Sequence, residues 1–261
     1  MDQIQLHENL RRTMIRIAHA SKSGHTHIGS CLSCIDIVAQ TVLFEMRRND
    51  KFILSKGHAS LALYVVLHEK KRITDEMLAS YFRDGGHFGI HPPASLPDDI
   101  PLPTGSLGHG LSFGCGVAKG FLYGRKRPTP RVFVLLSDGE CNEGAVWEAA
   151  MFASRHQLNN LVALIDRNGW QAFGRTKEVL GDAAAPDKWR AFGFNTYRVN
   201  GHRISDLRAV FKKIRATHNG KPHAVICDTL RGKGIKTLHD QLHSNYTTVD
   251  TAMLLQATGS H

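Results

Sequence analysis

The sequence lacks the features of a secreted, disulfide-bonded or membrane-spanning protein. Only five of its 261 residues are cysteines, an odd number that is spread along the chain. The N-terminus has no signal-peptide apolar region, and no apolar run approaches the ~20 residues of a membrane span. A disulfide framework is therefore disfavoured, and we expect a cytoplasmic protein without a membrane segment.

The sequence also lacks the marks of a nucleic-acid-binding protein, despite its charge. Lysine and arginine total 33 against 23 aspartates and glutamates, which gives a formal net charge of +10. These basic residues are scattered, with no dense block and no interleaved aromatic stripe. An anionic small molecule, an acidic protein partner or plain solubility explains the charge as well, so we expect no nucleic acid partner.

No internal repeat, low-complexity tract or linker divides the chain. Hydrophobic residues make up 42% of it, which is ordinary for a soluble globular protein and enough to build a core without disulfides. We therefore expect a single domain over residues 1–261.

One cysteine pair has the spacing of a metal or redox motif. Cys31 and Cys34 form C-x-x-C, and His25 and His27 precede them, so these four side chains are a possible zinc site. No second half-site with the usual spacing follows, and the pair falls within an apolar pattern of helical period. Zinc or redox chemistry is therefore disfavoured, and the role of the two thiols stays open.

The clearest structural signal lies in residues 131–170. Residues 132–136 and 161–165 are short apolar runs, rich enough in branched side chains to be strands buried on both faces. Residues 143–156 between them have apolar positions at spacings of three and four, which predicts a helix. A strand, a helix and a strand in this order form a unit whose strands are parallel.

Each of these two strands ends in oxygen-bearing side chains. Asp138 follows the first strand and Asn168 follows the second, 30 positions later. Because ligands of open parallel sheets bind at the carboxyl ends of strands, we expect the two side chains to lie close together. A carboxylate and an amide oxygen suit Mg²⁺ or Ca²⁺, and the N–H of Gly139 could donate to a phosphate. Two ordinary Asp-Gly and Asn-Gly turns remain the alternative.

The other patterns complete an α/β protein, with a doubly wound, mostly parallel sheet and helices on both faces. Thr74 is expected to cap a short helix, and the glycines of residues 111–123 suggest that this helix packs close to another helix or a cofactor. A dinucleotide fingerprint at residues 105–110 is excluded because no strand precedes it. The predicted helices are residues 6–20, 33–46, 59–69, 74–81, 111–123, 183–192 and 204–217; the further strands are 51–54, 195–199 and 223–229; and the main loops are 21–30, 83–103, 170–180 and 230–243.

Histidines recur in the glycine-rich loops. A single histidine in a loop is more often structural than functional, but several in one chain are harder to dismiss. Histidine can donate to phosphate or sugar oxygens and can transfer protons near neutral pH. The histidines in question are His25, His58, His91, His109 and His243.

Six segments together resemble the N-terminal, diphosphate-binding half of a transketolase. They occur in that family's order and cover nearly the whole chain, which makes the resemblance specific. The family resemblance implies the fold that binds thiamine diphosphate with Mg²⁺ or Ca²⁺. The segments are SGHTHIGSCLSCIDIV (23–38), ILSKGHASLALY (53–64), PTGSLGHGLSFGCGVAKG (103–120), SDGECNEGAVWEAAMFA (137–153), LVALIDRNG (161–169) and RGKG (231–234).

The resemblance also implies a set of site residues. His239 competes with His243 as the late-chain histidine, and Glu143 resembles an acidic residue that couples two cofactor sites across a subunit interface. The implied metal ligands are Asp138, Asn168 and the backbone carbonyl of Trp170; the implied cofactor contacts are His58, Gly105, Leu107, Gly139, Glu140, Asn168 and His243; and the implied catalytic residues are His25, His58, His91, His243 and Glu143.

The sequence departs from the family in two positions and in length. Ser137 stands where the family typically has glycine, and His109 stands where many members have glutamine. The pyrimidine-binding and C-terminal domains of a full-length transketolase are absent from these 261 residues. The resemblance therefore implies a second chain that supplies these domains, giving an α₂β₂ assembly, with residues 111–123 as a candidate contact face.

The expected activity is the reversible transfer of a two-carbon ketol unit from a ketose, phosphorylated or not, to an aldose. Within the same cofactor class, the alternatives are a deoxyxylulose-phosphate-synthase-like enzyme and the α chain of a 2-oxoacid dehydrogenase. The segments around Lys56-Gly57-His58 and residues 105–110 favour transketolase. A non-catalytic scaffold protein is the alternative from another class, and the intact Asp138 and Asn168 argue against it.

Overall fold

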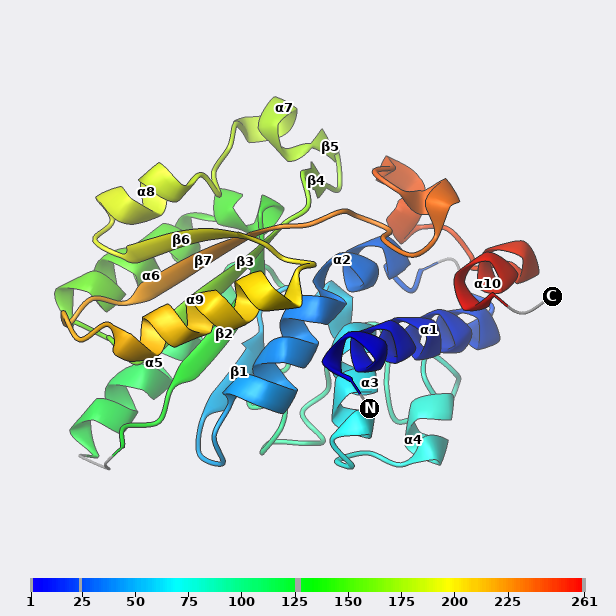
Figure 1. Cartoon of the computed structure of the whole chain (residues 1–261), viewed down its shortest axis with the longest axis horizontal. Helices are drawn as coiled ribbons and strands as arrows, with labels where there is room; N and C mark the ends of the chain where they lie inside the picture. Colours follow the sequence, from blue (N-terminus) through cyan, green and yellow to red (C-terminus); the bar gives the residue numbers. More distant parts are fainter. Residues whose placement is uncertain (1, 24, 125–127, 260–261) are drawn as a thin grey trace.

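The centre of the molecule is a five-stranded sheet in which all neighbouring strands are parallel. The structure, a computed structural model, describes residues 2–23, 25–124 and 128–259. The strand order is β1-β2-β3-β7-β6, and a separate antiparallel pair, β4 and β5, stands beyond one end of the sheet (Figure 1). The strands are β1 (Lys51–Leu54), β2 (Val132–Ser137), β3 (Leu161–Arg167), β4 (Trp170–Gln171), β5 (Gly174–Arg175), β6 (Asn195–Asn200) and β7 (His223–Asp228).

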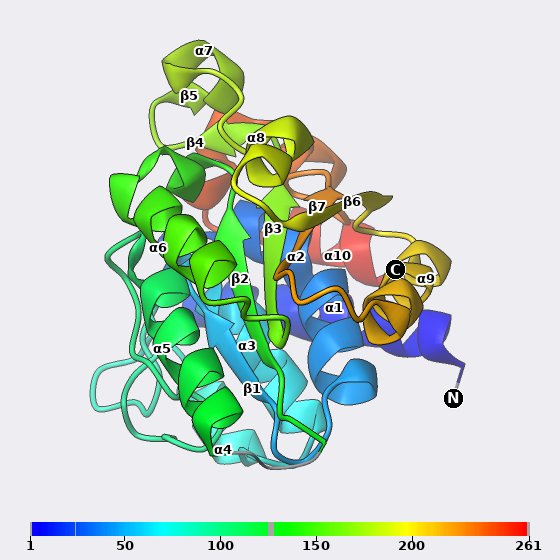
Figure 2. The same ribbon diagram turned by 90° about the vertical axis from the view of Figure 1, so that its left-hand side faces the viewer.

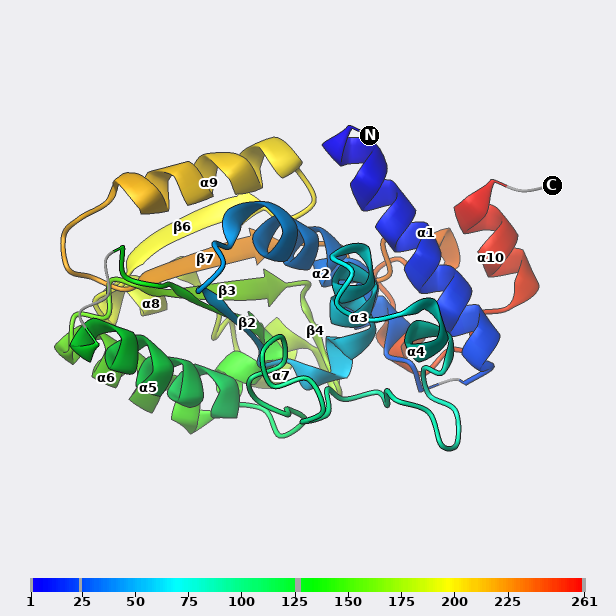
Figure 3. The ribbon, with the colours of Figure 1, turned by 90° about the horizontal axis from the view of Figure 1, so that it is seen from below.

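Helices cover both faces of this sheet, as predicted. In Figure 2 the strands lie between α5 and α6 on one side and α2 and α9 on the other, and Figure 3 shows the same layers from below. The helices are α1 (Gln3–Ser21), α2 (Ile28–Ala39), α3 (Ser60–Glu69), α4 (Asp75–Ala79), α5 (His109–Tyr123), α6 (Gly144–Arg155), α7 (Thr176–Leu180), α8 (Pro186–Ala191), α9 (Ile204–Ala216) and α10 (Thr251–Thr258).

The alternation of side chains along each strand divides the core into two clusters. Phe133 and Leu135 of β2 pack with α1, α2, α3 and α9. Val134 and Leu136 of the same strand pack with α5, α6 and α8 on the opposite face. Because both faces are covered, every residue of β2 is buried, and the apolar run has no polar period.

The glycines of α5 lie in two different environments, one packed against the sheet and one open. A Cβ on Gly114 would lie 2.6 Å from the side chain of Val134, so glycine lets this helix pack close to β2. A Cβ on Gly116 or Gly120 would meet nothing within 4 Å. The close packing was expected against another helix or a cofactor, but at Gly114 it is against the sheet, and Gly116 and Gly120 leave open space beside the helix.

Most of the predicted elements are present with shifted ends, and Thr74 caps α4 by accepting from the N–H of Met77. The prediction of a loop at residues 170–180 is wrong, because these residues form the β4–β5 hairpin and α7. Strands of two residues are too short to carry a periodic pattern. α10 was not predicted, although Asp250 accepts from the N–H of Met253 as an ordinary N-cap.

The second helix is longer than expected. It begins at Ile28, and a π-helical turn, Gln40–Glu45, continues it directly. By length and composition these 18 residues could cross a membrane, so the expectation that no apolar run approaches that length is wrong. Of these 18 residues, 83% are buried inside the fold, where the helix packs against α1 and α3.

Candidate active site at the carboxyl ends of the strands

The structure brings the ends of β2 and β3 together as the sequence predicted. Ser137 and Asp166 are paired in the register of the two strands, so Asp138 and Asn168 follow at the same edge of the sheet. The carboxylate of Asp138 accepts from the N–H of Gly169 at 2.8 Å and from the N–H of Gly139 at 3.0 Å. The two expected ligands thus belong to one small constellation.

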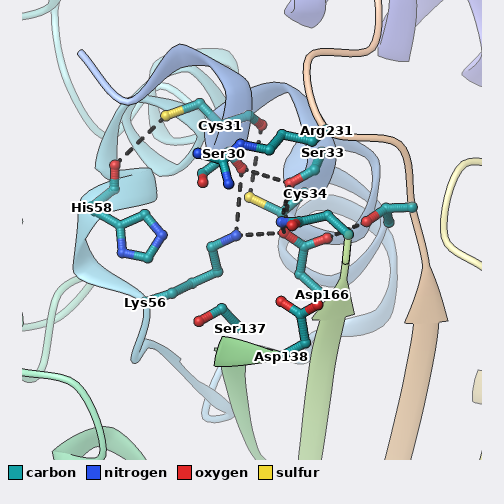
Figure 4. Close-up of polar contacts among 12 residues, drawn as sticks. Ser30, Cys31, Ser33, Cys34, Lys56, His58, Ser137, Asp138, Asp166 and Arg231 are labelled. Carbon is teal, nitrogen blue, oxygen red and sulfur yellow. Dashed lines mark hydrogen bonds and ion pairs between the residues drawn. The ribbon is translucent and has the colours of Figure 1, made fainter. Parts of the chain in front are cut away.

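A buried ion pair lies directly beside this constellation. The ammonium of Lys56, just after β1, binds the carboxylate of Asp166 at the end of β3, and both side chains are fully buried. The hydroxyls of Ser33 and Thr229 also donate to Asp166, each at 2.5 Å. Figure 4 shows Lys56 reaching across to Asp166, with Asp138 on the adjacent strand end.

The sequence reasoning missed this ion pair. A lysine and an aspartate at the ends of two apolar strands were the available signal, but the partners are 110 positions apart. Asn168 joins the same network, since its amide nitrogen donates to Asp166 at 3.2 Å while its amide oxygen accepts from the N–H of Trp170 at 3.0 Å. The ion pair therefore helps to orient an expected metal ligand.

Asp138 and Asp166 have opposite electrostatic environments. Burial would raise the pKa of Asp166, but Lys56 and the two hydroxyls outweigh it and the pKa is lowered. Burial raises the pKa of Asp138 to about 6, and the charge of Asp166 adds to the rise. Within the described part of the chain, no ion pair joins Asp138 to a basic side chain. Asp138 is thus a buried carboxylate whose charge a bound cation would offset.

The donor set suits a hard cation. The described residues contain no group of three histidine, cysteine, aspartate or glutamate side chains that could bind a metal. The expected set instead combines one carboxylate, one amide oxygen and the carbonyl of Trp170, an all-oxygen set of the kind that Mg²⁺ or Ca²⁺ accepts. The side chains present therefore fit a metal–diphosphate group.

Other expected cofactor contacts lie around the same edge. The N–H of Gly139 donates to Asp138, and a Cβ on this residue would lie 2.8 Å from Gln171. The carboxylate of Glu140 is fully buried and accepts from the N–H of Gly108 at 2.9 Å and from the hydroxyl of Ser55. Its side chain thus joins β1 to the start of α5, and burial raises its pKa.

Three histidines and a tyrosine form a ring cluster near this edge. The His27 ring centroid lies 5.6 Å from that of His58, 6.4 Å from that of His91 and 5.7 Å from that of Tyr246. Burial lowers the pKa of His27 and His58, and desolvation also lowers that of His91. Gly105 packs against His91, since a Cβ there would lie 3.4 Å from the imidazole. Leu107 is half-buried in the same segment.

The cluster contains His27 rather than the predicted His25. His25 is exposed and makes no ring contact within the described residues, but its carbonyl accepts from Nδ1 of His27 at 2.9 Å. His27 has a left-handed backbone, with φ of 50°, directly before α2. The two histidines are only two positions apart, and this local turn decides which one faces the other rings.

The remaining predicted residues lie outside the ring cluster. His243 is exposed in a short 3₁₀ turn, whereas His239 is half-buried and accepts from the N–H of Gly234 at 3.3 Å. His109 is exposed at the start of α5, and Glu143 is exposed directly before α6. The positions of these residues do not show whether His239 or His243 is the late-chain histidine of the site.

The cysteine pair is buried within α2. Cys31 donates weakly to the carbonyls of Thr26 and His58, and Cys34 donates to the carbonyl of Cys31. Burial raises the pKa of Cys31 to about 12 and also raises that of Cys34. Neutral, buried thiols of this kind are poor metal ligands and poor nucleophiles.

Comparison with known proteins identifies relatives of this chain. Residues 5–256 match the sequence profile of a family described as transketolase, thiamine diphosphate binding domain. The chain is 37% identical to one of the subunits of the apulose-4-phosphate transketolase of Phocaeicola vulgatus, covering 87% of this chain and 82% of that protein. It is 31% identical to the 6-deoxy-6-sulfo-D-fructose transketolase subunit SqwG of a Clostridium species, covering 88% and 86% respectively.

Longer transketolases are similar over part of their length. The chain is 35% identical to human transketolase, covering 89% of this chain and 37% of that protein. The transketolase structure from Leishmania mexicana superimposes with a TM-score of 0.87 at 24% identity, covering 99% of this chain and 41% of that one. At this identity the superposition shows a shared fold. The chain thus spans about two fifths of the length of that solved structure.

Proposed function

The chain belongs to the transketolase family and carries its thiamine diphosphate-binding domain, and we propose that it is one subunit of a two-chain transketolase. The activity would be the transfer of a two-carbon ketol unit from a ketose to an aldose. The observation that supports this most is the buried Asp138 beside Asn168 at the strand ends, which forms an ion pair with no basic side chain of the described residues. Relatives named as single subunits of transketolases, matched over most of their length, support the two-chain assembly.

Asp138, Asn168 and the carbonyl of Trp170 would hold Mg²⁺ or Ca²⁺, and the metal would hold the diphosphate. Thiamine diphosphate, when bound, supplies the carbanion chemistry that cleaves and forms the carbon–carbon bond. Of the other predicted contacts, we retain His58, Gly105, Leu107, Gly139, Glu140 and His243 as residues around the cofactor. For Glu140 the contribution would be indirect, because its carboxylate is occupied by Ser55 and Gly108.

His27, His58 and His91 would orient sugar oxygens and transfer protons there. Their lowered pKa values keep them neutral near pH 7. A neutral imidazole can accept a proton from a hydroxyl or donate a hydrogen bond to a carbonyl oxygen. We assign to His27 the role that the sequence predicted for His25, because the ring of His27 contacts the other two.

The partner chain would bind an exposed apolar face formed by α5 and α6, which pack side by side. Tyr123 is 75% exposed and Met151 is 54% exposed on this face, and Gly116 and Gly120 leave room for a close approach. Glu143 is exposed directly before α6, which is consistent with its predicted place at a subunit interface. An α₂β₂ assembly in the cytoplasm, acting on sugars or sugar phosphates, completes the proposal. The apolar side chains of the face are Phe113, Tyr123, Met151 and Phe152.

The function is tested by paired histidine variants in the assembled complex. The chain would be co-expressed with a chain that carries pyrimidine-binding and C-terminal transketolase domains, and ketol transfer would be measured. His27→Gln should lower kcat about 100-fold, in the range of general acid–base catalysis, whereas His25→Gln should change it less than about threefold. Equal effects of the two changes would contradict the assignment of His27. No transfer by the wild-type complex with any ketose–aldose pair would contradict the function itself.

The partner face has a separate test. Tyr123→Asp should weaken assembly with the partner chain, measured by analytical ultracentrifugation, because it places a charge in the proposed apolar interface. Ile4→Asp on α1 is the matched control, since Ile4 is also exposed, at 58%, but lies on another helix. If both variants assemble as the wild type does, the partner binds elsewhere.

A further inference from the structure

The β4–β5 hairpin has little structural support of its own. Trp170 pairs with Arg175 and Gln171 pairs with Gly174, so each strand has only two residues. An isolated hairpin of this size is not stable in water without other contacts. The hairpin nevertheless carries the Trp170 carbonyl that we assign to the metal, so whatever holds it also holds that ligand.

Three side chains fasten this hairpin to the loop that follows β7. The guanidinium of Arg175 binds the carboxylate of Asp240 through two parallel hydrogen bonds of 2.6 Å each. The indole N–H of Trp170 donates to the same carboxylate at 2.7 Å. The guanidinium also lies over the Trp170 ring, 4.0 Å from its centroid. Each member therefore contacts the other two.

The loop that carries Asp240 is itself fastened to the core. The N–H of Asp240 donates to the carbonyl of Arg231, whose fully buried side chain donates to Ser244. The N–H of Gly232 donates to the carbonyl of Gly29 in α2, and the N–H of Ser30 donates to Asn245. Asp240 thus lies in a loop that is hydrogen-bonded to α2 and to the buried side chain of Arg231.

We propose that Trp170, Arg175 and Asp240 form a clasp that fixes the β4–β5 hairpin and thereby positions the Trp170 carbonyl as a metal ligand. The three are positioning residues, because their side chains act through a backbone oxygen. Arg175 and Asp240 are 40% and 45% exposed, so solvent screens their attraction. The contribution of the clasp is therefore expected in ligand geometry rather than in overall stability. The proposal rests on the proposed function, since it assumes a metal–diphosphate at the strand ends.

Conservative variants separate the parts of the clasp. Arg175→Lys keeps the positive charge and loses the bidentate hydrogen bonding to Asp240. Asp240→Asn removes the charge and keeps a residue that tolerates the left-handed φ of 56° at this position. Trp170→Phe keeps a ring under the guanidinium and loses the N–H donor, while the backbone carbonyl remains. Arg198→Lys is the matched control, because Arg198 makes a partly exposed 2.6 Å bond to Asp228 elsewhere in the chain.

The test is calorimetric titration of the chain, assembled with its partner chain, with thiamine diphosphate in the presence of Mg²⁺. Arg175→Lys and Asp240→Asn should each weaken binding about tenfold, as is usual for groups that orient a metal ligand. The double variant should lose little more than either single one, since both break the same contact. Hydrogen exchange at residues 170–176 should become faster in these variants, and Arg198→Lys should leave binding unchanged.

Two results distinguish a failure of the clasp from a failure of the proposed function. If the clasp variants bind as tightly as the wild type while Asp138→Ala abolishes binding, the metal site stands and the clasp proposal is wrong. If the wild-type complex of the two chains binds no thiamine diphosphate with Mg²⁺, the proposed function is wrong. Additive losses in the double variant would also overturn the clasp, because the two residues would then act separately.

Discussion

Asp138 and Asp166 end neighbouring strands and are equally inaccessible, yet their surroundings differ. Asp166 has a lysine and two hydroxyls as partners, and its pKa is lowered. Among the residues that the structure describes, Asp138 accepts from backbone N–H groups and the hydroxyl of Thr176 and from no basic side chain, and burial raises its pKa to about 6. One buried charge is thus neutralised by the chain and the other is left for a ligand.

The comparison indicates which of two buried carboxylates is structural. A fully paired buried charge stabilises a particular arrangement of strands and loops, and removing one partner leaves an uncompensated charge. An unpaired buried charge costs free energy in the folded chain and is retained where something binds to it. Substitutions at Asp138 and at Asp166, or at their partners, should therefore change the stability of the chain differently.

The largest effect is expected from breaking the ion pair. Lys56→Met leaves Asp166 buried without its cation and should lower the free energy of unfolding by about 3–5 kcal/mol. The measurement is urea unfolding in the presence of a chelator. Lys70→Met, a change at an exposed lysine just after α3, should alter stability by less than about 0.5 kcal/mol. A loss below about 1 kcal/mol in Lys56→Met would show that Asp166 does not need this partner.

Asparagine at the two aspartates should have opposite effects on stability. Without divalent cations at pH 8, Asp138→Asn should raise the free energy of unfolding by about 1–3 kcal/mol, because it removes an unpaired buried charge. Asp166→Asn should lower it, because Lys56 then loses its partner. Urea unfolding in the presence of a chelator compares the free energies of unfolding of the two variants. A change of the same sign in both variants would show that the two aspartates do not differ in this way.

The increase in the free energy of unfolding that is expected for Asp138→Asn should depend on pH. The folded chain binds the Asp138 proton with a pKa of about 6, compared with 3.8 for an unperturbed aspartate. The stabilising effect of this group is therefore full at low pH and is lost as pH rises to about 6. In metal-free buffer, the stability difference between wild type and Asp138→Asn should be near zero at pH 4 and complete at pH 7. A difference that is constant over this range would show that Asp138 is not perturbed.

Single hydroxyl deletions should have smaller effects than the loss of Lys56. Thr229→Val removes a 2.5 Å hydrogen bond to Asp166 and should cost about 1.5–3 kcal/mol, the range for bonds to charged groups. Thr176→Val removes a 3.2 Å bond to Asp138 and should cost about 1 kcal/mol, because the longer bond is weaker. Thermal unfolding would measure both, and a larger loss in Thr176→Val would reverse the ranking of the two carboxylates.

The sheet and the strand-end ligands could be predicted because their signals are local. Apolar runs buried on both faces predicted β2 and β3, and the parallel connection between them placed Asp138 and Asn168 at one edge. The bond between Lys56 and Asp166 could not be predicted in the same way. It depends on which strand neighbours which across 110 residues, and the order β1-β2-β3-β7-β6 is a property of the whole fold.

Short-range geometry also limited the prediction of the site. His25 and His27 lie in one glycine-containing loop, and nothing in their spacing shows that the backbone turns left-handed at His27. The β4–β5 hairpin has too few residues for any periodicity, so its clasp to Asp240 had no signal in the sequence. These features depend on single backbone angles and on contacts between distant loops.

The central claim is that Asp138 is left unpaired in order to bind a metal–diphosphate. Calorimetric titration of the chain assembled with its partner chain, using thiamine diphosphate with and without Mg²⁺, tests it most directly. The wild type should bind only when Mg²⁺ is present, and Asp138→Asn should bind at least about 100-fold more weakly, as expected for the loss of a metal ligand. Binding by Asp138→Asn as tight as that of the wild type, or binding that is independent of Mg²⁺, would contradict the claim.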